Sequence, residues 1–179
     1  MKQFDLVAAD ELIADRIAGK QMACARNCSW CCHQLIVMTN RDDAVAMLRS
    51  ARTQMSSAEF HDFELALREQ AAEIGSLTHE RAESKHWTCP FLRDNSCSVY
   101  DLRPIACRSV FSSDAGCCKA MMEAERFEEL SDEQQALATE VGARAMALQI
   151  EINDLRPITG AVEMRSLLVE LLDERDSNL

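Results

Sequence analysis

Residues 24–32 read CARNCSWCC and place four cysteines, Cys24, Cys28, Cys31 and Cys32, within nine positions. Packing alone does not explain this density, because buried cysteines are usually scattered over the core-facing sides of different helices. A helix would bring the four sulfur atoms into a sector of about 100°, whereas a turn would give Cys28 and Cys31 the two-residue spacing common at zinc and iron–sulfur sites. Either backbone predicts converging thiols.

A second cysteine-rich stretch begins more than fifty residues later. It reads CPFLRDNSCSVYDLRPIACRSVFSSDAGCC and holds the other five cysteines, Cys89, Cys97, Cys107, Cys117 and Cys118. Since no cysteine lies outside the two stretches, we expect the stretches to meet in space and to hold metal together. The adjacent Cys31 and Cys32 point in different directions in any regular backbone, so two metal centres, or one multinuclear cluster, would strain the chain less than a single ion.

The composition is that of a helical protein with reduced cysteines. Apolar residues make up 47% and charged residues 27% of the chain, and aromatic residues, glycine and proline are scarce. We expect a single domain over residues 1–179, with a cysteine-cluster core at 22–118 and C-terminal helices at 119–174. The odd cysteine count argues against a disulfide framework, and no stretch is typical of a signal peptide or a membrane span. These features predict a cytoplasmic protein.

The formal net charge of −11 argues against nucleic-acid binding, because phosphate contacts need clustered Lys and Arg. Residues 85–119 nevertheless carry five basic and three acidic side chains. Thiolates around a divalent ion leave negative charge to be compensated, so basic side chains beside the cysteines are candidates for this role. These are Arg93, Arg103, Arg108 and Lys119. We prefer Arg103 and Arg108, because a guanidinium can donate to sulfur and stay charged.

Apolar residues recur at helical spacing along most of the remaining chain. We expect helices at about residues 3–19, 39–55, 56–75, 114–127, 131–157 and 160–174, with capping boxes at Ser56/Glu59 and Ser131/Gln134. Thr39 and Asp114 are candidate caps for two of them. Residues 34–39, QLIVMT, are the best strand candidate, and residues 109–111 could pair with them. The predicted fold class is mainly α: a helical domain with a cysteine-rich metal-binding loop region and at most a small two-stranded sheet.

The spacing C-x-x-x-C-x-x-C-C at 24–32, with CPFL at 89–92 and CSVYDLRPIACR at 97–108, resembles the YkgJ-type cysteine-cluster family, described as zinc- or iron-chelating. The likeness covers roughly residues 22–118. The family's usual eight cysteines imply the metal ligands Cys24, Cys28, Cys31, Cys32, Cys89, Cys97, Cys107 and one of Cys117 or Cys118. We favour Cys118, one helical turn past Asp114.

The resemblance implies a metal ion as partner, bound as zinc or in an iron–sulfur cluster, and implies no particular activity. We expect a non-catalytic structural, sensing or metal-handling role, since the sequence shows no catalytic constellation and no phosphate-binding loop, and its thiols can close a coordination sphere. The alternative is an iron–sulfur enzyme of redox or methyl-transfer type, because flagellin lysine N-methylase carries a similar cluster. A third hypothesis is an interaction module built on the acidic C-terminal helices. We expect neither nucleic acid nor membrane as a partner.

Overall fold

The computed structural model describes residues 4–25, 27–33, 36–155 and 160–176. The α-helices are α1 (Phe4–Ile17), α2 (Arg41–Gln54), α3 (Ser57–Ser76), α4 (His79–Glu83), α5 (Ile105–Arg108), α6 (Ala115–Glu123), α7 (Asp132–Leu155) and α8 (Met164–Asp176). The 3₁₀ helices are η1 (Trp30–His33), η2 (Tyr100–Leu102) and η3 (Phe127–Glu129), and the strands are β1 (Met38–Thr39), β2 (Leu92–Arg93), β3 (Ser96–Cys97) and β4 (Val162–Glu163). Over the described ranges, no helix is both long and apolar enough to cross a membrane.

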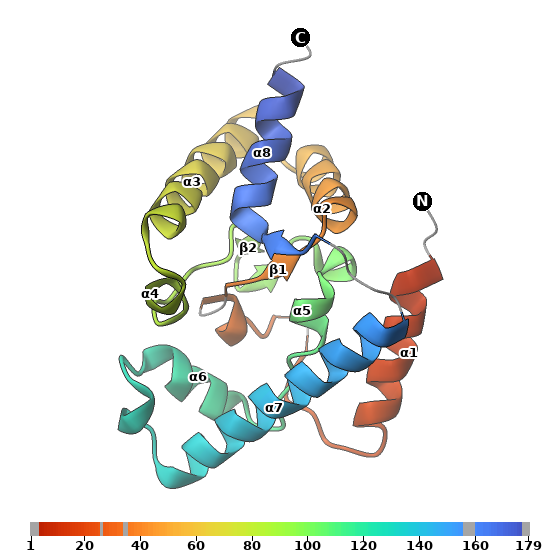
Figure 1. Cartoon of the computed structure of the whole chain (residues 1–179), viewed down its shortest axis with the longest axis vertical. Helices are drawn as coiled ribbons and strands as arrows, with labels where there is room; N and C mark the ends of the chain where they lie inside the picture. The colour runs from red at the N-terminus through yellow and green to blue at the C-terminus, as the bar shows by residue number, and fades with distance from the viewer. Residues whose placement is uncertain (1–3, 26, 34–35, 156–159, 177–179) are drawn as a thin grey trace.

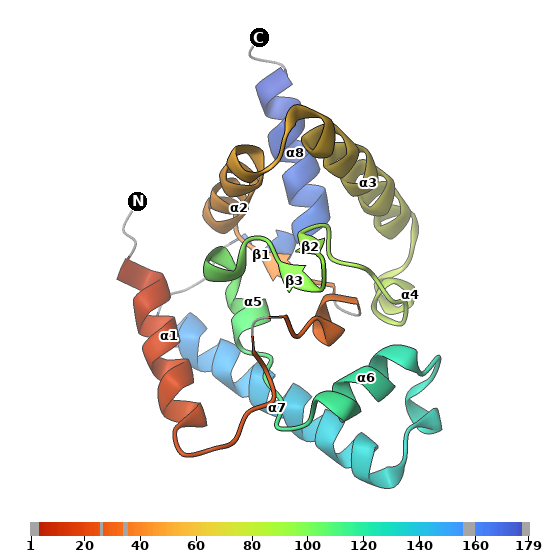
Figure 2. The same ribbon diagram turned by 180° about the vertical axis from the view of Figure 1, so that it is seen from behind.

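The helices gather at two ends of the molecule, with the small sheets and α5 between them. Figure 1 and Figure 2 show α2, α3 and α8 side by side at one end, and α1, α6 and α7 at the other. The fold class predicted from the sequence is therefore confirmed, since the protein is mainly helical and has a cysteine-rich region. Its sheets have two strands each.

Most predicted helix starts are confirmed by their caps. Ser56 and Glu59 form the capping box of α3, and Ser131 and Gln134 exchange the same pair of bonds at α7. The side chain of Asp114 accepts two backbone N–H groups at the start of α6. These short polar motifs act locally, which is why the sequence alone reveals them.

Three helix boundaries differ from the prediction, one of them the start of α8, which lies at Met164 after β4 and not near residue 160. Asn40, not Thr39, caps α2, because the Asn40 side chain accepts the Asp43 N–H at 2.9 Å while Thr39 is paired in β1. Helix α6 ends at Glu123 and does not reach Phe127, which lies in η3. The end predicted for α7 at Pro157 lies outside the described residues.

The predicted strand exists, but its predicted partner is wrong. Strand β1 pairs antiparallel with β4, with Met38 opposite Glu163 and Thr39 opposite Val162. Residues 109–111 form no strand and lie against α7, where the Ser109 hydroxyl accepts a hydrogen bond from Gln149 at 2.9 Å. Residues 34 and 35 of the predicted run are outside the described part of the chain.

The second sheet is a hairpin that the sequence analysis did not predict. Leu92 pairs with Cys97 and Arg93 with Ser96, so only two residues join the strands. These two, Asp94 and Asn95, have φ angles of 47° and 57°, as a type I′ turn requires. The hairpin matters because one of its strands carries a cysteine.

Buried apolar side chains form more than one cluster. The α2/α3/α8 cluster contains Phe91 and Val99 from the cysteine-rich region, and Cys89, Cys97 and Cys107 pack against it. The α5/α7 cluster consists of Ile105, Phe111, Leu148 and Ile152, with partly buried residues of α1 packed on it. Helix α5 contributes to both, since Ile105 belongs to the second cluster and Cys107 touches the first.

Candidate metal centre

A turn and a short helix present three of the early cysteines. The Cys28 N–H donates to the Ala25 carbonyl at 3.1 Å, and Asn27 between them has a φ of 73°. Cys31 and Cys32 follow on η1, where their side chains are hydrogen-bonded to each other. The segment is thus a turn followed by a 3₁₀ helix and not one continuous α-helix.

Cys24 meets the end of the second cysteine segment through Ser112. The Ala23 N–H donates to the Ser112 carbonyl at 2.9 Å, and the Ser112 N–H donates to the Cys24 Sγ at 3.2 Å. The Ser112 side chain also forms a hydrogen bond with Cys118. Cys118 lies on α6, and its N–H faces the Asp114 carbonyl at 3.4 Å, one helical turn earlier. This buried serine therefore joins the first and the last of the predicted ligands.

The other three cysteines are positioned by the hairpin and by α5. Cys89 precedes the hairpin, and its N–H donates to the Cys32 carbonyl at 2.7 Å, which ties the two segments together directly. Cys97 lies on β3. Cys107 lies on α5, where Pro104 precedes the first turn.

These thiols surround a common cavity of about 50 Å³. The cysteines that line it are Cys28, Cys31, Cys32, Cys89, Cys97 and Cys107. Apolar side chains such as Met47, Phe91 and Met164 complete the wall. One water molecule needs roughly 10–15 Å³ of such space, so the cavity has room for an ion or a small cluster. The structure thus brings six of the eight predicted ligands around one space and places Cys24 and Cys118 beside it.

Cys117 faces away from this cavity. It is buried, and its Sγ lies 3.6 Å from the Gln134 carbonyl of α7. The neighbouring Cys118 instead interacts with Cys24 and Cys28. The two adjacent residues therefore have different surroundings, and only Cys118 lies with the other thiols.

The environment of the thiols favours their neutral form in the absence of metal. Burial raises the pKa of Cys89 to about 11, and burial together with neighbouring thiols raises the pKa of Cys107 well above its usual value. The hydrogen bond with Cys32, followed by burial, raises the pKa of Cys31. All nine cysteines have free thiols. A metal ion must therefore displace protons from them, so its binding is coupled to proton release.

Several sulfur atoms already accept hydrogen bonds from the backbone. The Cys24 Sγ accepts one from Ser112, and Cys89 and Cys97 each accept one from the N–H two positions later. Such bonds lower the pKa of the thiol, because they stabilise the thiolate. Hydrogen bonds to sulfur are also a means by which proteins tune thiolate-bound iron and zinc.

The thiols suit a thiophilic metal, although they are not yet close enough to one another to coordinate an ion. Within the described ranges, no three His, Cys, Asp or Glu side chains are arranged so that they could hold a metal ion as they stand. Neutral thiols gain nothing by converging, whereas thiolates converge on a shared cation. The described residues that line the cavity include no carboxylate and no imidazole, so sulfur would supply the ligands, which suits both zinc and iron–sulfur sites.

Residues 23–115 match the family model CxxCxxCC, which is described as "Putative zinc- or iron-chelating domain". The chain belongs to the CxxCxxCC family. The matched residues form more than half of the chain and include both cysteine segments as far as Cys107, while Cys117 and Cys118 lie beyond them. No match was found among curated proteins or among solved structures. The family thus supports metal binding without distinguishing zinc from iron.

Of the basic side chains considered from the sequence, Arg103 is the one placed at the thiol cavity of this CxxCxxCC protein. It lines the cavity, and its Nε donates to the Tyr100 carbonyl at 2.9 Å while its guanidinium lies 3.6 Å from the Tyr100 ring centroid. Its charge lowers the pKa of several thiols, Cys31 and Cys107 among them, against the larger effect of burial. Arg103 can therefore offset negative charge on the thiolates.

The preference for Arg108 as a second such residue is wrong. Its guanidinium is buried and donates to the Asp10 carboxylate at 2.7 Å and to the Asp101 carbonyl, and its Nε donates to the Arg103 carbonyl at 2.7 Å. Consecutive residues of α5 point about 100° apart, so Arg108 faces α1 when Cys107 faces the cavity. The remaining two candidates form ion pairs, Arg93 with Glu59 and Lys119 with Glu123.

We predict that replacing Arg108 by Met lowers the free energy of unfolding by about 2–3 kcal/mol and leaves the metal content unchanged. The loss follows because two backbone carbonyls lose a charged donor and α1 loses its ion pair. Denaturation with guanidinium chloride measures the free energy of unfolding, and elemental analysis measures the metal content. Arg16→Met is the matched control, since the half-exposed Arg16 joins α1 to Glu151 at the surface, where an ion pair contributes little and the stability should stay close to that of the wild type. An Arg108 variant of normal stability with less metal would contradict this assignment.

The family match also leaves out a charged residue that the sequence analysis missed. Arg165, in the first turn of α8, is fully buried, and its charge lowers the pKa of Cys89. Arg165 lies far from every cysteine in the sequence, so proximity along the chain does not identify it. The available signal was an arginine at a position where α8 otherwise places Met164, Leu167 and Leu168 in the core.

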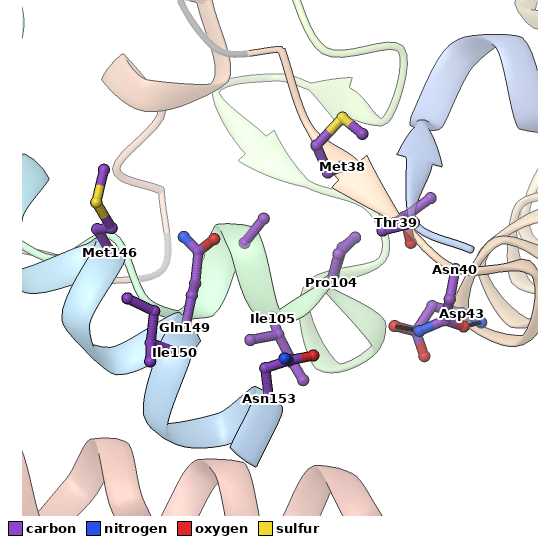
Figure 3. A pocket seen from close by; sticks show the side chains of 12 residues that line it. Met38, Thr39, Asn40, Asp43, Pro104, Ile105, Met146, Gln149, Ile150 and Asn153 are labelled. Atoms are coloured by element: carbon purple, nitrogen blue, oxygen red, sulfur yellow. Dashed lines mark hydrogen bonds between the residues drawn. The ribbon is translucent and has the colours of Figure 1, made fainter. Parts of the chain in front are cut away.

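A larger cavity of about 320 Å³ lies between β1, α5 and α7 (Figure 3). Met38, Met146 and Ile150 line it, together with polar side chains such as Asn40 and Asp43, which are hydrogen-bonded to each other at 2.9 Å. Among the described residues, its lining contains no cysteine and no histidine. The thiol cavity is therefore the better candidate for the chemistry of this CxxCxxCC protein.

Proposed function

We propose that this protein binds zinc or an iron–sulfur cluster through the thiolates of eight cysteines and has a non-catalytic structural, sensing or metal-handling role. The proposed ligands are Cys24, Cys28, Cys31, Cys32, Cys89, Cys97, Cys107 and Cys118. The observation that carries the proposal is the single cavity lined by six of these thiols, drawn from two segments far apart in the chain.

The arrangement of the thiols supports two centres or one multinuclear cluster in preference to a single ion. Cys31, Cys89, Cys97 and Cys107 affect one another's pKa and face the cavity. The remaining proposed ligands are Cys24 and Cys118, which are both hydrogen-bonded to Ser112, Cys28, which interacts with both of them, and Cys32, which contacts Cys31. A tetrahedral zinc site takes four thiolates, so the eight cysteines match two such sites in number.

The side chains around the thiols favour a closed, unreactive centre. Met47, Phe91 and Met164 would exclude water from the bound metal, and the Arg103 charge would offset part of the negative charge of the thiolates. Four thiolates that close the coordination sphere make zinc chemically quiet, whereas an iron–sulfur cluster would add electron transfer.

Metal analysis of protein purified without oxygen tests the proposal. We expect either a colourless protein with roughly two zinc ions per chain or a brown protein with iron and acid-labile sulfide. Zinc and iron would be measured by elemental analysis, and the cluster by its visible absorption. A correctly folded protein that retains neither metal, before or after incubation with each, would disprove the proposed function.

Adjacent residues of α6 offer a test of the last ligand. We predict that Cys118→Ser lowers the zinc or iron content by about half, because one centre loses a thiolate, whereas Cys117→Ser leaves the content unchanged. Both substitutions remove one sulfur from the same helix. They differ only in that the Cys118 side chain faces the other thiols and the Cys117 side chain does not. The reverse result, metal lost only from the Cys117 variant, would exchange the two roles.

A further inference from the structure

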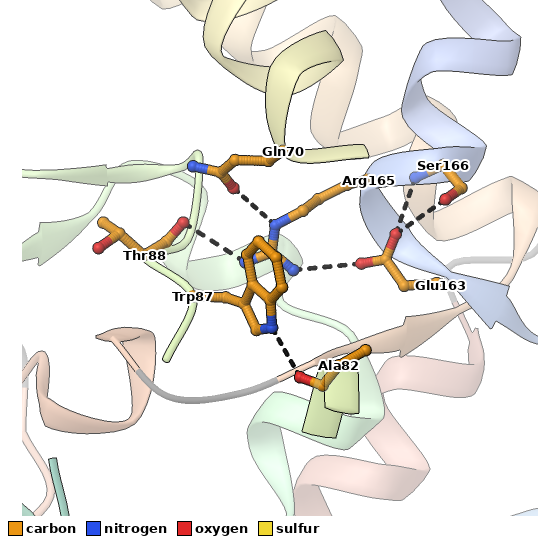
Figure 4. A network of polar contacts seen from close by, with 7 residues as sticks. All are labelled: Gln70, Ala82, Trp87, Thr88, Glu163, Arg165 and Ser166. Atoms are coloured by element: carbon orange, nitrogen blue, oxygen red, sulfur yellow. Dashed lines mark hydrogen bonds and ion pairs between the residues drawn. The ribbon is translucent and has the colours of Figure 1, made fainter. Parts of the chain in front are cut away.

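The guanidinium of Arg165 is held by contacts from three other parts of the fold (Figure 4). Its Nε donates to the Gln70 Oε1 of α3 at 2.7 Å, and its two terminal nitrogens reach the Glu163 Oε1 of β4 at 3.1 Å and the Thr88 carbonyl at 3.4 Å. Only 1% of the Arg165 side chain is exposed. A buried guanidinium is costly to desolvate, so a position that keeps one requires such complete pairing.

The contact with Thr88 places this charge next to a proposed metal ligand. Cys89 follows Thr88 directly, and its N–H donates to the Cys32 carbonyl at 2.7 Å. Arg165 therefore braces the peptide at the point where the two cysteine segments are joined.

The carboxylate of Glu163, which pairs with Arg165, uses its two oxygens for different partners. The Oε1 of Glu163 pairs with Arg165, whereas its Oε2 accepts the Ser166 N–H at 2.9 Å and the Ser166 hydroxyl at 3.1 Å at the start of α8. Glu163 is thus both a helix cap and the counter-ion of Arg165.

We propose that Arg165 is a positioning residue of the metal centre, which fixes the Thr88–Cys89 peptide and offsets the negative charge of the metal-bound Cys89 thiolate. The proposal rests on the proposed function and extends it, because Arg165 lies fifty residues beyond the matched range 23–115. It makes α8 part of the centre, although α8 contains no cysteine.

The test withdraws zinc from the zinc-loaded protein with a chelator of known affinity and compares variants. Arg165→Met should lower the zinc affinity about 10–100-fold, the range usual for outer residues that orient metal ligands. Arg165→Lys keeps the charge and should recover part of that loss. Cobalt loading gives a second readout, because the sulfur-to-cobalt absorption of the Met variant should fall as Cys89 binds less. Arg68→Met is the matched control, since Arg68 pairs with Asp173 of α8 at 2.7 Å on the surface and should leave the affinity unchanged.

Glu163→Gln separates the charge effect from a loss of stability and serves if Arg165→Met does not fold. It removes the counter-ion but leaves Arg165, so thermal stability should fall while zinc affinity stays equal or rises. Zinc affinity equal to that of the wild type in both Arg165 variants would overturn the proposal. A Glu163→Gln variant whose zinc affinity falls together with its thermal stability would also overturn the proposal. A wild-type protein that takes up no metal would instead overturn the proposed function, and the role of Arg165 with it.

Discussion

Replacing Cys107 by Ser is expected to lower the bound metal by half or more and the free energy of unfolding by at least about 3 kcal/mol. Cys107 lines the cavity, packs against the α2/α3/α8 cluster and lies on α5, whose Ile105 belongs to the α5/α7 cluster. A serine oxygen is a poor ligand for a thiophilic metal, so the centre would lose both a ligand and its link to α5. Metal analysis and urea denaturation of protein prepared without oxygen measure the two effects.

Two comparisons make this result specific. Cys31→Ser should behave like Cys107→Ser, because Cys31 lines the same cavity from the other cysteine segment. Cys117→Ser should retain the metal, since its sulfur faces Gln134. An unchanged metal content in both the Cys31 and the Cys107 variant would show that the ligand assignment is wrong.

Removing the metal from the intact protein should lower its stability by a similar amount. We expect a strong chelator to lower the Tm by at least about 10 °C, which corresponds to about 3–5 kcal/mol for a domain of this size. The free energy of binding is lost because the unfolded chain holds no preformed site. Calorimetry before and after chelation, under reducing conditions, measures the shift.

The addition of excess zinc or iron provides the control for this experiment. Restored thermal stability would show that chelation acted by removing the metal and not through damage to the protein. A Tm that the chelator leaves unchanged, in protein shown by elemental analysis to have lost its metal, would contradict a structural role for the centre.

The sequence predicts the features of this fold that depend on neighbouring residues. The capping boxes at Ser56 and Ser131 and the cap at Asp114 are local hydrogen bonds, so a few letters specify them. The pairing of β1 with β4 joins residues more than one hundred positions apart and involves two residues on each side. No periodicity can be read from strands so short, and for that reason the predicted partner, residues 109–111, is wrong.

The sequence predicts the residue types of the candidate site and the meeting of its two cysteine segments, but not the direction of each side chain. Cysteine density, spacing and the family resemblance identified the candidate ligands, and the structure adds that Cys117 and Cys118 face different ways. Charge beside the cysteines in sequence singled out Arg103 and Arg108, of which only Arg103 faces the thiols. Arg165 could not be found in this way, because its proximity to Cys89 depends on the packing of α8 against α3.

The contact of the second cysteine segment with two apolar clusters has a consequence for the behaviour of the metal-free chain. This segment contributes Phe91 and Val99 to the α2/α3/α8 cluster and Ile105 and Phe111 to the α5/α7 cluster, while its own backbone forms only a short hairpin and single turns. Loss of the ion would loosen the cysteine segments before the helices unfold, and proteases would gain access to these segments first. Metal occupancy would then set how firmly the two clusters are coupled through the cysteine segments.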